Sequence, residues 1–307
     1  MTKHVLPEGP FTLDEATSIG TGKHALTRMQ RDGVVTRVLP GLYWRTVDLE
    51  GTTSRQRHLT IAEKVLGSFD GASVLARESA AIVHGLATPR RLPNGPKTIS
   101  LYASNHRNSR NAAGVQVTVT PLHVGDVVQV DGIPVTSLSR TAIDLARGMT
   151  IPYALIALDS ALRLGAPREV LMQTALAMKG WSGTKLLRSV IPLADGLAES
   201  ALESAARGSC LAAGLPAPQL QRPIAGASGK QYRVDMLWEQ ASLIVEPDGW
   251  GKYGELPQQQ EDALRREKHR EDDLREADFT VLRVTWDGLG ALPQRVARHL
   301  SRRQRHR

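Results

Sequence analysis

The sequence predicts an α/β (α+β) protein, and two observations lead to this prediction. Segments with helical apolar spacing are interleaved along the chain with segments whose apolar residues alternate with period two. The 307 residues are 41% hydrophobic and 23% charged, which is enough apolar material for several cores and argues against a disordered chain. At roughly 150 residues per domain, this length indicates about two domains.

The first part of the chain has the pattern of two helices followed by a hairpin. Helices are expected at 11–19 and 23–32, and strands are expected at 34–38 and 42–45. Thr21 is the expected cap of the second helix, and Gly33 is expected to end it.

The middle of the chain changes from helices to strands and back to helices. Helices are expected at 54–68 and 73–85. The strands expected next are 98–102, 115–119, 127–130 and 133–135. The helices that follow are expected at about 138–147, 151–164, 167–178 and 182–191.

The last part opens with a helix over 197–213 and continues mainly as strands. The further expected elements are strands 219–224, 231–238 and 241–246, a charged helix over 257–277, a strand over 279–284 and a short C-terminal helix. Near Asp195 and Gly196 the chain changes from a helix-rich pattern to alternating helix and strand patterns. The sequence therefore predicts three domains, over 1–50, 51–195 and 196–307.

Composition limits where the protein can act. The one cysteine, Cys210, lies on the apolar side of its helix and cannot form an internal disulfide or a cysteine-based zinc site. In residues 1–7, no apolar run follows Lys3, as it would in a signal peptide. No segment of the chain approaches about 18 uncharged apolar residues, the length needed to span a membrane. We therefore expect a cytoplasmic protein with no signal peptide, no membrane span and no disulfide.

The positive charge is concentrated at the C-terminus. The net charge is +8, and the last 13 residues hold six arginines and no acid, so the rest of the chain carries only +2. Such a tail attracts phosphate. The alternative is a solvated, frayed terminus.

Helix, short turn, helix and hairpin is the pattern of a winged helix–turn–helix. The second helix is expected to bury Leu26 and Met29, with Tyr43 and Trp44 packed under the hairpin. A helix of this kind fits the DNA major groove, where cations contact phosphates or guanine edges. The predicted contacts with double-stranded DNA are Lys23, His24, Thr27, Arg28, Arg31, Arg37 and Arg45. A protein-binding winged helix with an ordinary solvated basic face is the alternative.

Three segments, GVVTRVLPGLYW, ARESAAIVHGL and VDGIPVTSLSRTAIDLA, resemble the AbiEi family of antitoxins from type IV toxin–antitoxin systems. The resemblance covers about residues 5–165. It implies a winged-helix DNA binder that represses its own operon, followed by an α/β domain linked to antitoxin action. It also implies a cognate toxin as a possible partner, and DNA contacts through Lys23, Arg28, Arg31, Arg37 and Arg45.

The most informative chemistry follows residue 196. Asp235 and Glu246 are carboxylates flanked by apolar strand residues, and neighbouring strands would bring them to one end of a sheet. Converging oxygen ligands suit Mg²⁺, which polarises a phosphodiester and activates water. Glu203 and Asp248 complete the acidic set, and Lys252 or Lys268 could stabilise developing charge.

Ordinary charge pairing is the alternative interpretation of these acids. Glu203 could pair with Arg207 one turn later, and Asp235 with Arg233 or with an arginine of the charged helix. Asp248 would then only form a turn.

The charged helix has two interpretations of its own. Its charges at helical spacing are typical of a solvated face. Alternatively, four of its cations could grip phosphates, namely Arg265, Arg266, Lys268 and Arg270. His269 is expected at the surface.

Four segments in order, SALESAARGSCLAAGLPAPQLQ, YRVDMLW, LIVEPDGWGKY and REKHREDDLREADFTVLRVTW, resemble the restriction-endonuclease-like domain related to very-short-patch-repair endonucleases, within the PD-(D/E)xK superfamily. The resemblance runs over about residues 197–290. It implies Glu203 as the opening-helix acid, Asp235 as the metal-binding aspartate and Glu246 as the second metal acid. Asp248 stands where the superfamily has lysine, and residues 250–253 lack the histidine that this branch often carries.

Two functions follow from these patterns. The first is a Mg²⁺-dependent DNA endonuclease addressed by its own winged helix, in phage defence or DNA repair. The second is a non-catalytic antitoxin or transcriptional repressor whose nuclease fold serves as a binding module. Cleavage of RNA is a weaker third hypothesis, because no aromatic stacking motif supports it.

Overall fold

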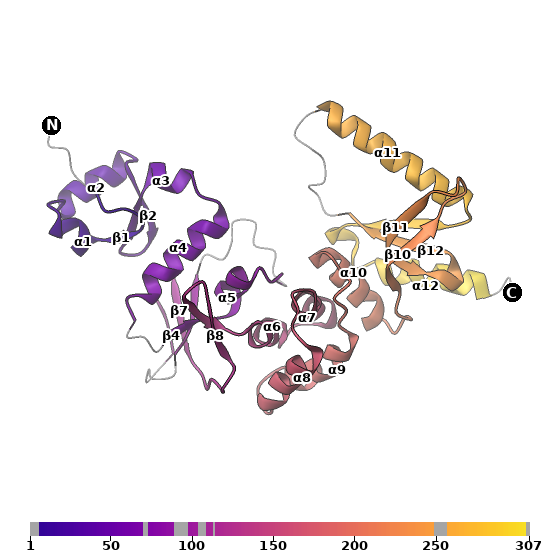
Figure 1. Ribbon diagram of the computed structural model, residues 1–307, viewed down its shortest axis with the longest axis horizontal. Coiled ribbons are helices and arrows are strands. Elements are labelled where there is room, and N and C mark those ends of the chain that lie inside the picture. The colour runs from indigo at the N-terminus through magenta and orange to yellow at the C-terminus, as the bar shows by residue number, and fades with distance from the viewer. Residues whose placement is uncertain are drawn as a thin grey trace. The chain divides into compact units, whose positions relative to one another are not determined.

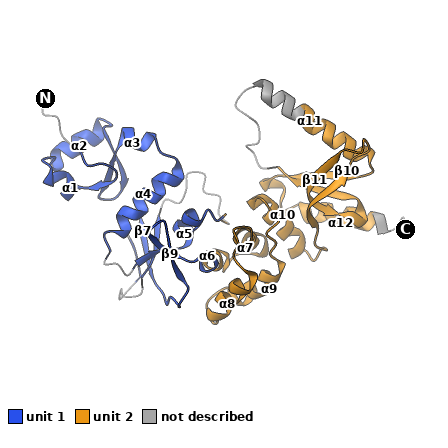
Figure 2. Cartoon of the chain, viewed as in Figure 1, with its two compact units in different colours: residues 1–86, 90–141 blue, residues 87–89, 142–307 orange. Residues whose placement is uncertain are grey.

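The computed structural model describes residues 6–69, 73–88, 98–103, 109–112, 114–248 and 257–304, with helices and strands interleaved (Figure 1). The predicted α/β fold class is confirmed. The chain divides into two compact units, residues 1–86 with 90–141 and residues 87–89 with 142–307 (Figure 2).

The first unit begins with two short helices and a three-stranded sheet. Helices α1 (Leu13–Ser18) and α2 (Lys23–Arg31) precede a hairpin of β2 (Val35–Leu39) and β3 (Leu42–Arg45), and β1 (Phe11–Thr12) pairs with β3. The strand order is β1-β3-β2. The two helices and the hairpin follow in the predicted order, although the residues expected to begin the first helix form a short strand.

Local interactions and a small core hold this region together. Thr12 caps α1 in a reciprocal capping box with Glu15, whose backbone N–H donates to the Thr12 hydroxyl at 3.3 Å. The core residues are Phe11, Ala16, Leu26 and Val35, with Met29 and Tyr43 against them. The predicted cap of α2 was wrong, because Gly22 is its N-cap and Thr21 is fully buried instead.

The rest of the first unit is a six-stranded sheet with helices. Helices α3 (Thr46–Glu50), which was not predicted, α4 (Ser54–Leu66) and α5 (Arg77–His84) accompany it. The strand order is β6-β7-β5-β4-β9-β8. The strands are β4 (Ser73–Leu75), β5 (Ile99–Ala103), β6 (Arg110–Ala112), β7 (Val115–Val119), β8 (Val127–Val130) and β9 (Ile133–Thr136).

The helix predicted over 73–85 is a strand followed by a helix. Residues 73–75 are buried and pair antiparallel with β5 and parallel with β9, which lies about 60 residues away along the chain. Local apolar spacing does not distinguish a buried strand from the first turn of a helix. The strand is specified by its two distant neighbours.

The second unit contains a group of helices and a second sheet. The helices are α6 (Leu138–Ala146), within which the two units divide, α7 (Ile151–Arg163), α8 (Arg168–Ala177), α9 (Thr184–Val190) and α10 (Ala201–Ala212). Short 3-10 helices lie at Ile191–Leu193, Glu239–Ala241 and Trp286–Gly288.

Helix α10 packs closely on α7, and this packing joins the helices to the C-terminal sheet. A Cβ atom at Gly208 would lie 2.6 Å from the Cα of Pro152, so only glycine allows this approach. Arg207 donates to both carboxylate oxygens of the fully buried Asp159, at 2.8 and 2.7 Å. The compact units therefore divide at 141/142, whereas the sequence placed a domain boundary at 195/196.

The C-terminal sheet has the order β10-β11-β12-β13. Its strands are β10 (Gln219–Ala225), β11 (Gln231–Trp238), β12 (Leu243–Pro247) and β13 (Thr280–Val284). The first three are antiparallel, and β13 runs parallel to β12. Helices α11 (Pro257–Glu276) and α12 (Leu292–Gln304) follow β12 and β13 in the chain.

Two apolar clusters lie on this sheet. In one, strand residues such as Met236 and Val245 pack with Leu202 of α10 and Val296 of α12. In the other, strand residues such as Ile244 pack with Leu274 of α11. Helices α10 and α12 therefore share one core and α11 belongs to the other. Cys210 is fully buried in the first cluster, as predicted, and burial raises its pKa to about 12.

No helix among the described residues is both long enough and apolar enough to cross a membrane.

Candidate functional site

Strands β11 and β12 bring the two predicted metal acids together. The pairs Leu237–Ile244 and Met236–Val245 set the register, and Asp235 and Glu246 are the next residues of the two strands beyond the last pair. The Asp235 charge is one of the causes that raise the pKa of Glu246, which agrees with this proximity. The expected convergence of these two acids is therefore present.

Helix α10 adds the third acid. Glu203 lies in the first turn of the helix, where its backbone N–H donates to the N-cap Ser200 hydroxyl at 3.1 Å. Its Oε2 accepts from the backbone N–H of Glu199 at 2.8 Å and from Nε2 of Gln221 at 3.0 Å. The same Nε2 donates to Oδ1 of Asp235 at 3.2 Å. Gln221, on β10, thus bridges two of the predicted acids.

We define the carboxylate site as Glu203, Asp235 and Glu246 with Gln221. The sequence identified the three acids, whereas it assigned Gln221 no role. Gln221 is the last residue of the first nuclease-like segment, so a signal was present in the sequence, but its backbone conformation and contacts were not predictable from spacing.

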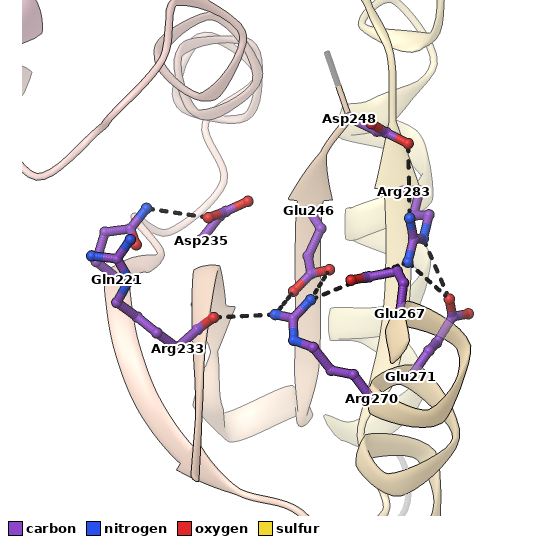
Figure 3. Close-up of polar contacts among 9 residues, drawn as sticks. All are labelled: Gln221, Arg233, Asp235, Glu246, Asp248, Glu267, Arg270, Glu271 and Arg283. Atoms are coloured by element: carbon purple, nitrogen blue, oxygen red, sulfur yellow. Dashed lines mark hydrogen bonds and ion pairs between the residues drawn. The ribbon is translucent and has the colours of Figure 1, made fainter. Parts of the chain in front are cut away.

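Glu246 is held by an arginine of α11. Nη1 of Arg270 donates to Oε2 of Glu246 at 2.9 Å, and Nη2 donates to Oε1 (Figure 3). Arg270 also donates to Glu267 at 3.1 Å and to the backbone carbonyl of Arg233 at 3.1 Å. Both carboxylate oxygens of one predicted metal acid therefore accept hydrogen bonds from a guanidinium fork.

The pKa of Glu246 reflects two opposed influences. Burial is the largest and raises the pKa, while the hydrogen bonds and charge of Arg270 lower it. Asp235 and Glu267 add to the increase, and the pKa ends above its ordinary value.

Asp248 lies beyond the end of β12 and has a different partner. Its backbone N–H donates to the carbonyl of Val284 at 2.8 Å, and its carboxylate lies 3.8 Å from Nη1 of Arg283. Figure 3 shows Asp248 directed to Arg283, whereas Asp235 points toward Gln221. Arg283 also donates to Glu267 at 2.6 Å and Glu271 at 3.3 Å, so these charges form one network.

The sequence offered two lysines that could stabilise developing charge, and neither takes part in the contacts described above. Lys252 lies outside the described residues, and Lys268 is exposed on α11. A cation that does contact one of the predicted metal acids is Arg270, for which the sequence suggested phosphate contacts. Arg265, Arg266 and His269 are exposed, the last as expected.

The two arginines named in the alternative interpretation, Arg207 and Arg233, form ion pairs with other acids. Arg207 binds Asp159 and the carbonyl of Leu193 rather than Glu203. Arg233 donates to both oxygens of Glu199 at 2.8 Å. Burial raises the pKa of Asp159 despite the opposing Arg207 charge.

The carboxylate site contains oxygen donors of the kind that Mg²⁺ binds. Glu203, Asp235 and Glu246 offer carboxylate oxygens, and Gln221 offers an amide oxygen, Oε1, that is buried and has no hydrogen-bond partner among the described residues. In the arrangement described, no three acidic, histidine or cysteine side chains of the described residues form a metal-ligand group. The Gln221 and Arg270 donors instead occupy carboxylate oxygens that a cation would take.

The N-terminal region presents a separate basic surface. Six of the seven predicted DNA contacts are exposed, and we call them the N-terminal basic face: Lys23, His24, Thr27, Arg28, Arg31 and Arg37. Leu26 is buried on the opposite side of α2. The seventh, Arg45, is half-buried and donates from Nε to Asp48 at 2.5 Å.

Helix α12 carries the arginine-rich tail as ordered structure up to Gln304. Arg295, Arg298, His299 and Arg302 line a small cavity of about 180 Å³. Burial and the three neighbouring arginines lower the pKa of His299. The described part of the tail is thus a cationic helix.

Comparison with known proteins identifies relatives but no activity. No family model matches the chain. The uncharacterized proteins Rv2248 and MT2308 of Mycobacterium tuberculosis strains are each 36% identical over 179 residues, which is 57% of this chain and 64% of theirs. The chain thus spans somewhat less than two thirds of the length of these relatives.

The comparison with solved structures found a distant match. The crystal structure of the Rv2827c protein from Mycobacterium tuberculosis matches with a TM-score of 0.39 and 14% identity, over 71% of this chain and 83% of that one.

Proposed function

We propose that the protein is a cytoplasmic DNA-binding protein whose C-terminal domain hydrolyses DNA phosphodiesters with Mg²⁺, in phage defence or DNA repair. The observation that carries this proposal is that Asp235 and Glu246 lie on neighbouring strands at the same end of their pairing, and that Gln221 bridges Asp235 to Glu203 of α10. The likeness of the surrounding segments to very-short-patch-repair-type nucleases of the PD-(D/E)xK superfamily supports the same assignment.

In this proposal Asp235 and Glu246 hold the ion and Glu203 orients it. The bound ion would polarise a phosphodiester and lower the pKa of a water. Arg270 lowers the pKa of Glu246 against the larger effect of burial, and its planar fork is also suited to a phosphodiester. The N-terminal basic face would hold the duplex through its phosphates.

Supercoiled plasmid incubated with the pure protein tests this function. We expect nicking or linearisation that depends on Mg²⁺ or Mn²⁺ and is abolished in Asp235→Asn and in Glu246→Gln, because a neutral amide keeps the size but loses the charge that a hard cation needs. Glu203→Gln should lose less activity. Absence of cleavage by the wild type with either ion would reject the nuclease assignment.

The second candidate is a non-catalytic regulator similar to the AbiEi antitoxins, with a cognate toxin as a possible partner. The observation that favours it is the engagement of both Glu246 oxygens by Arg270, since a binding module needs no free metal ligand. Footprinting on the DNA upstream of its own gene tests this candidate. A protected site with no cleavage would support it, and failure to protect any site would reject it.

A further inference from the structure

Gln221 has a backbone conformation that is rare for its residue type. Its φ is +52°, in the left-handed region, although it lies inside strand β10. The pairs on either side, Leu220–Met236 and Arg222–Val234, are regular, so the ladder is interrupted only where Gln221 faces Asp235. Strained backbone of this kind persists where the surrounding structure requires it, often at functional sites.

Among the described residues, the nitrogen of the Gln221 amide makes two polar contacts and the oxygen makes none. Its Nε2 donates to Glu203 at 3.0 Å and to Asp235 at 3.2 Å. Its Oε1 is buried and accepts no hydrogen bond from the described residues. A buried amide oxygen without a donor is costly and therefore calls for an explanation.

The two contacts explain the orientation of the amide. Two carboxylates that share a site repel each other, and a neutral N–H₂ group placed between them reduces that repulsion without adding charge. An oxygen in the same place would be repelled by both acids unless a cation lay among them. When no ion is bound, the amide is therefore expected to direct its N–H₂ group at the two acids. When a cation lies among the acids, the amide oxygen is the favoured group in that place.

We infer that Gln221 is a fourth member of the carboxylate site: its amide holds Glu203 and Asp235 together in the free protein and supplies a neutral oxygen to a bound divalent cation. This inference rests on the proposed metal-dependent function. Its strained backbone is the means by which a strand residue reaches both acids.

Binding of Mn²⁺ to the full chain, measured by calorimetry, tests this inference without reference to cleavage. We expect Gln221→Ala to weaken Mn²⁺ binding by about tenfold to a hundredfold, the range seen when groups that support metal ligands are removed. The matched control is Gln219→Ala, because Gln219 lies on the same strand and donates to a surface glutamate, Glu239, at 3.1 Å. The control should bind Mn²⁺ like the wild type.

Two further variants separate the amide from the backbone. Gln221→Gly removes the side chain but relieves the left-handed strain. It should therefore unfold at a higher Tm than Gln221→Ala and bind Mn²⁺ equally weakly. Gln221→Glu keeps an oxygen but replaces the bridging N–H₂ with a further negative charge. Its metal-free Tm should fall, and Mn²⁺ should raise that Tm by more than it raises the wild-type Tm.

The outcomes distinguish this inference from the proposed function. If the wild type binds Mn²⁺ and Gln221→Ala binds within twofold of it, the role of Gln221 is overturned while the metal site stands. Restored affinity in Gln221→Gly would also overturn it, because the backbone alone would then be responsible. If the wild type binds no Mn²⁺, the role of Gln221 and the proposed metal-dependent function are both rejected. If the wild type binds Mn²⁺ but cleaves no DNA, the nuclease assignment is rejected. The Mn²⁺ affinities of the variants still decide the role of Gln221.

Discussion

The N-terminal basic face and the carboxylate site differ in how their charged groups are held. On the N-terminal face, the side chains of Lys23, Arg28 and Arg37 are exposed to solvent. In the carboxylate site, Glu203 and Glu246 are buried and accept hydrogen bonds from other parts of the chain. Exposed cations are replaceable without loss of fold, whereas buried acids are coupled to the structure that surrounds them.

This difference leads to distinct expectations for substitutions in the two regions. Changes in the basic face should alter binding and leave stability unchanged. Changes in the carboxylate site should alter stability as well as chemistry.

The largest effect is expected from Arg270→Ala. It leaves the Glu246 carboxylate buried without its partner, and breaking such a pair costs about 3 kcal/mol of unfolding free energy. Denaturant unfolding monitored by circular dichroism measures this loss. The control is Arg266→Ala, an exposed arginine of the same helix, which should change stability little. Equal losses in both variants would contradict the coupling of Glu246 to Arg270.

The next effect concerns the basic face. Replacing Arg28, Arg31 and Arg37 together with Ala should weaken binding to a mixed-sequence duplex by several-fold to hundreds-fold. The slope of log affinity against log salt should become shallower by about 0.9 for each phosphate that the variant no longer neutralises. Fluorescence anisotropy at several salt concentrations measures both quantities.

A control for this variant is the pair Lys179→Ala and Lys185→Ala, two exposed lysines of the second unit. It should leave the affinity nearly unchanged. If the two sets of substitutions weaken binding equally, the N-terminal face has no special role, and general attraction through the basic protein explains the affinity.

A smaller effect is expected in the pH dependence of stability. The pKa of Glu246 is raised in the folded protein, chiefly by burial, so the folded state binds this proton more tightly than the unfolded chain. The stability linked to this proton is fully present below the ordinary pKa of glutamate and is lost as the pH rises through the raised folded pKa.

Glu246→Gln has no such proton. The unfolding free energy of the variant should therefore rise relative to that of the wild type as the pH increases from about 4 to about 7. Urea unfolding across this range measures the difference, and Glu239→Gln at an exposed position is the control. A constant difference would mean that Arg270 fully compensates the burial.

The smallest effect is expected from Arg45→Ala. Arg45 already donates to Asp48 at 2.5 Å, so it is less available to DNA than the exposed arginines of the same region. We expect DNA affinity to fall less than twofold and Tm to change slightly. A loss as large as that from Arg28→Ala alone would show that Arg45 leaves Asp48 when DNA binds.

Local pattern was sufficient for most of the elements in both regions. Helix α2 follows from its apolar spacing, and strand β7 (Val115–Val119) from its period-two alternation. The acids of the carboxylate site were also identifiable, because a carboxylate inside an apolar strand stands out from its neighbours. Asp235 and Glu246 are both of this kind.

The sequence by itself therefore determined the fold class, most of the elements, the exposed basic face and the identities of the three acids, because each of these depends on residues close together in the chain. Tertiary structure alone decided the partners. Arg207 binds Asp159, 48 residues away, and Arg270 binds Glu246, 24 residues away. The strand at 73–75 and the left-handed backbone of Gln221 likewise depend on neighbours distant in sequence. Buried charges take the partners that the packed core brings within reach, and local spacing contains no information about those distances.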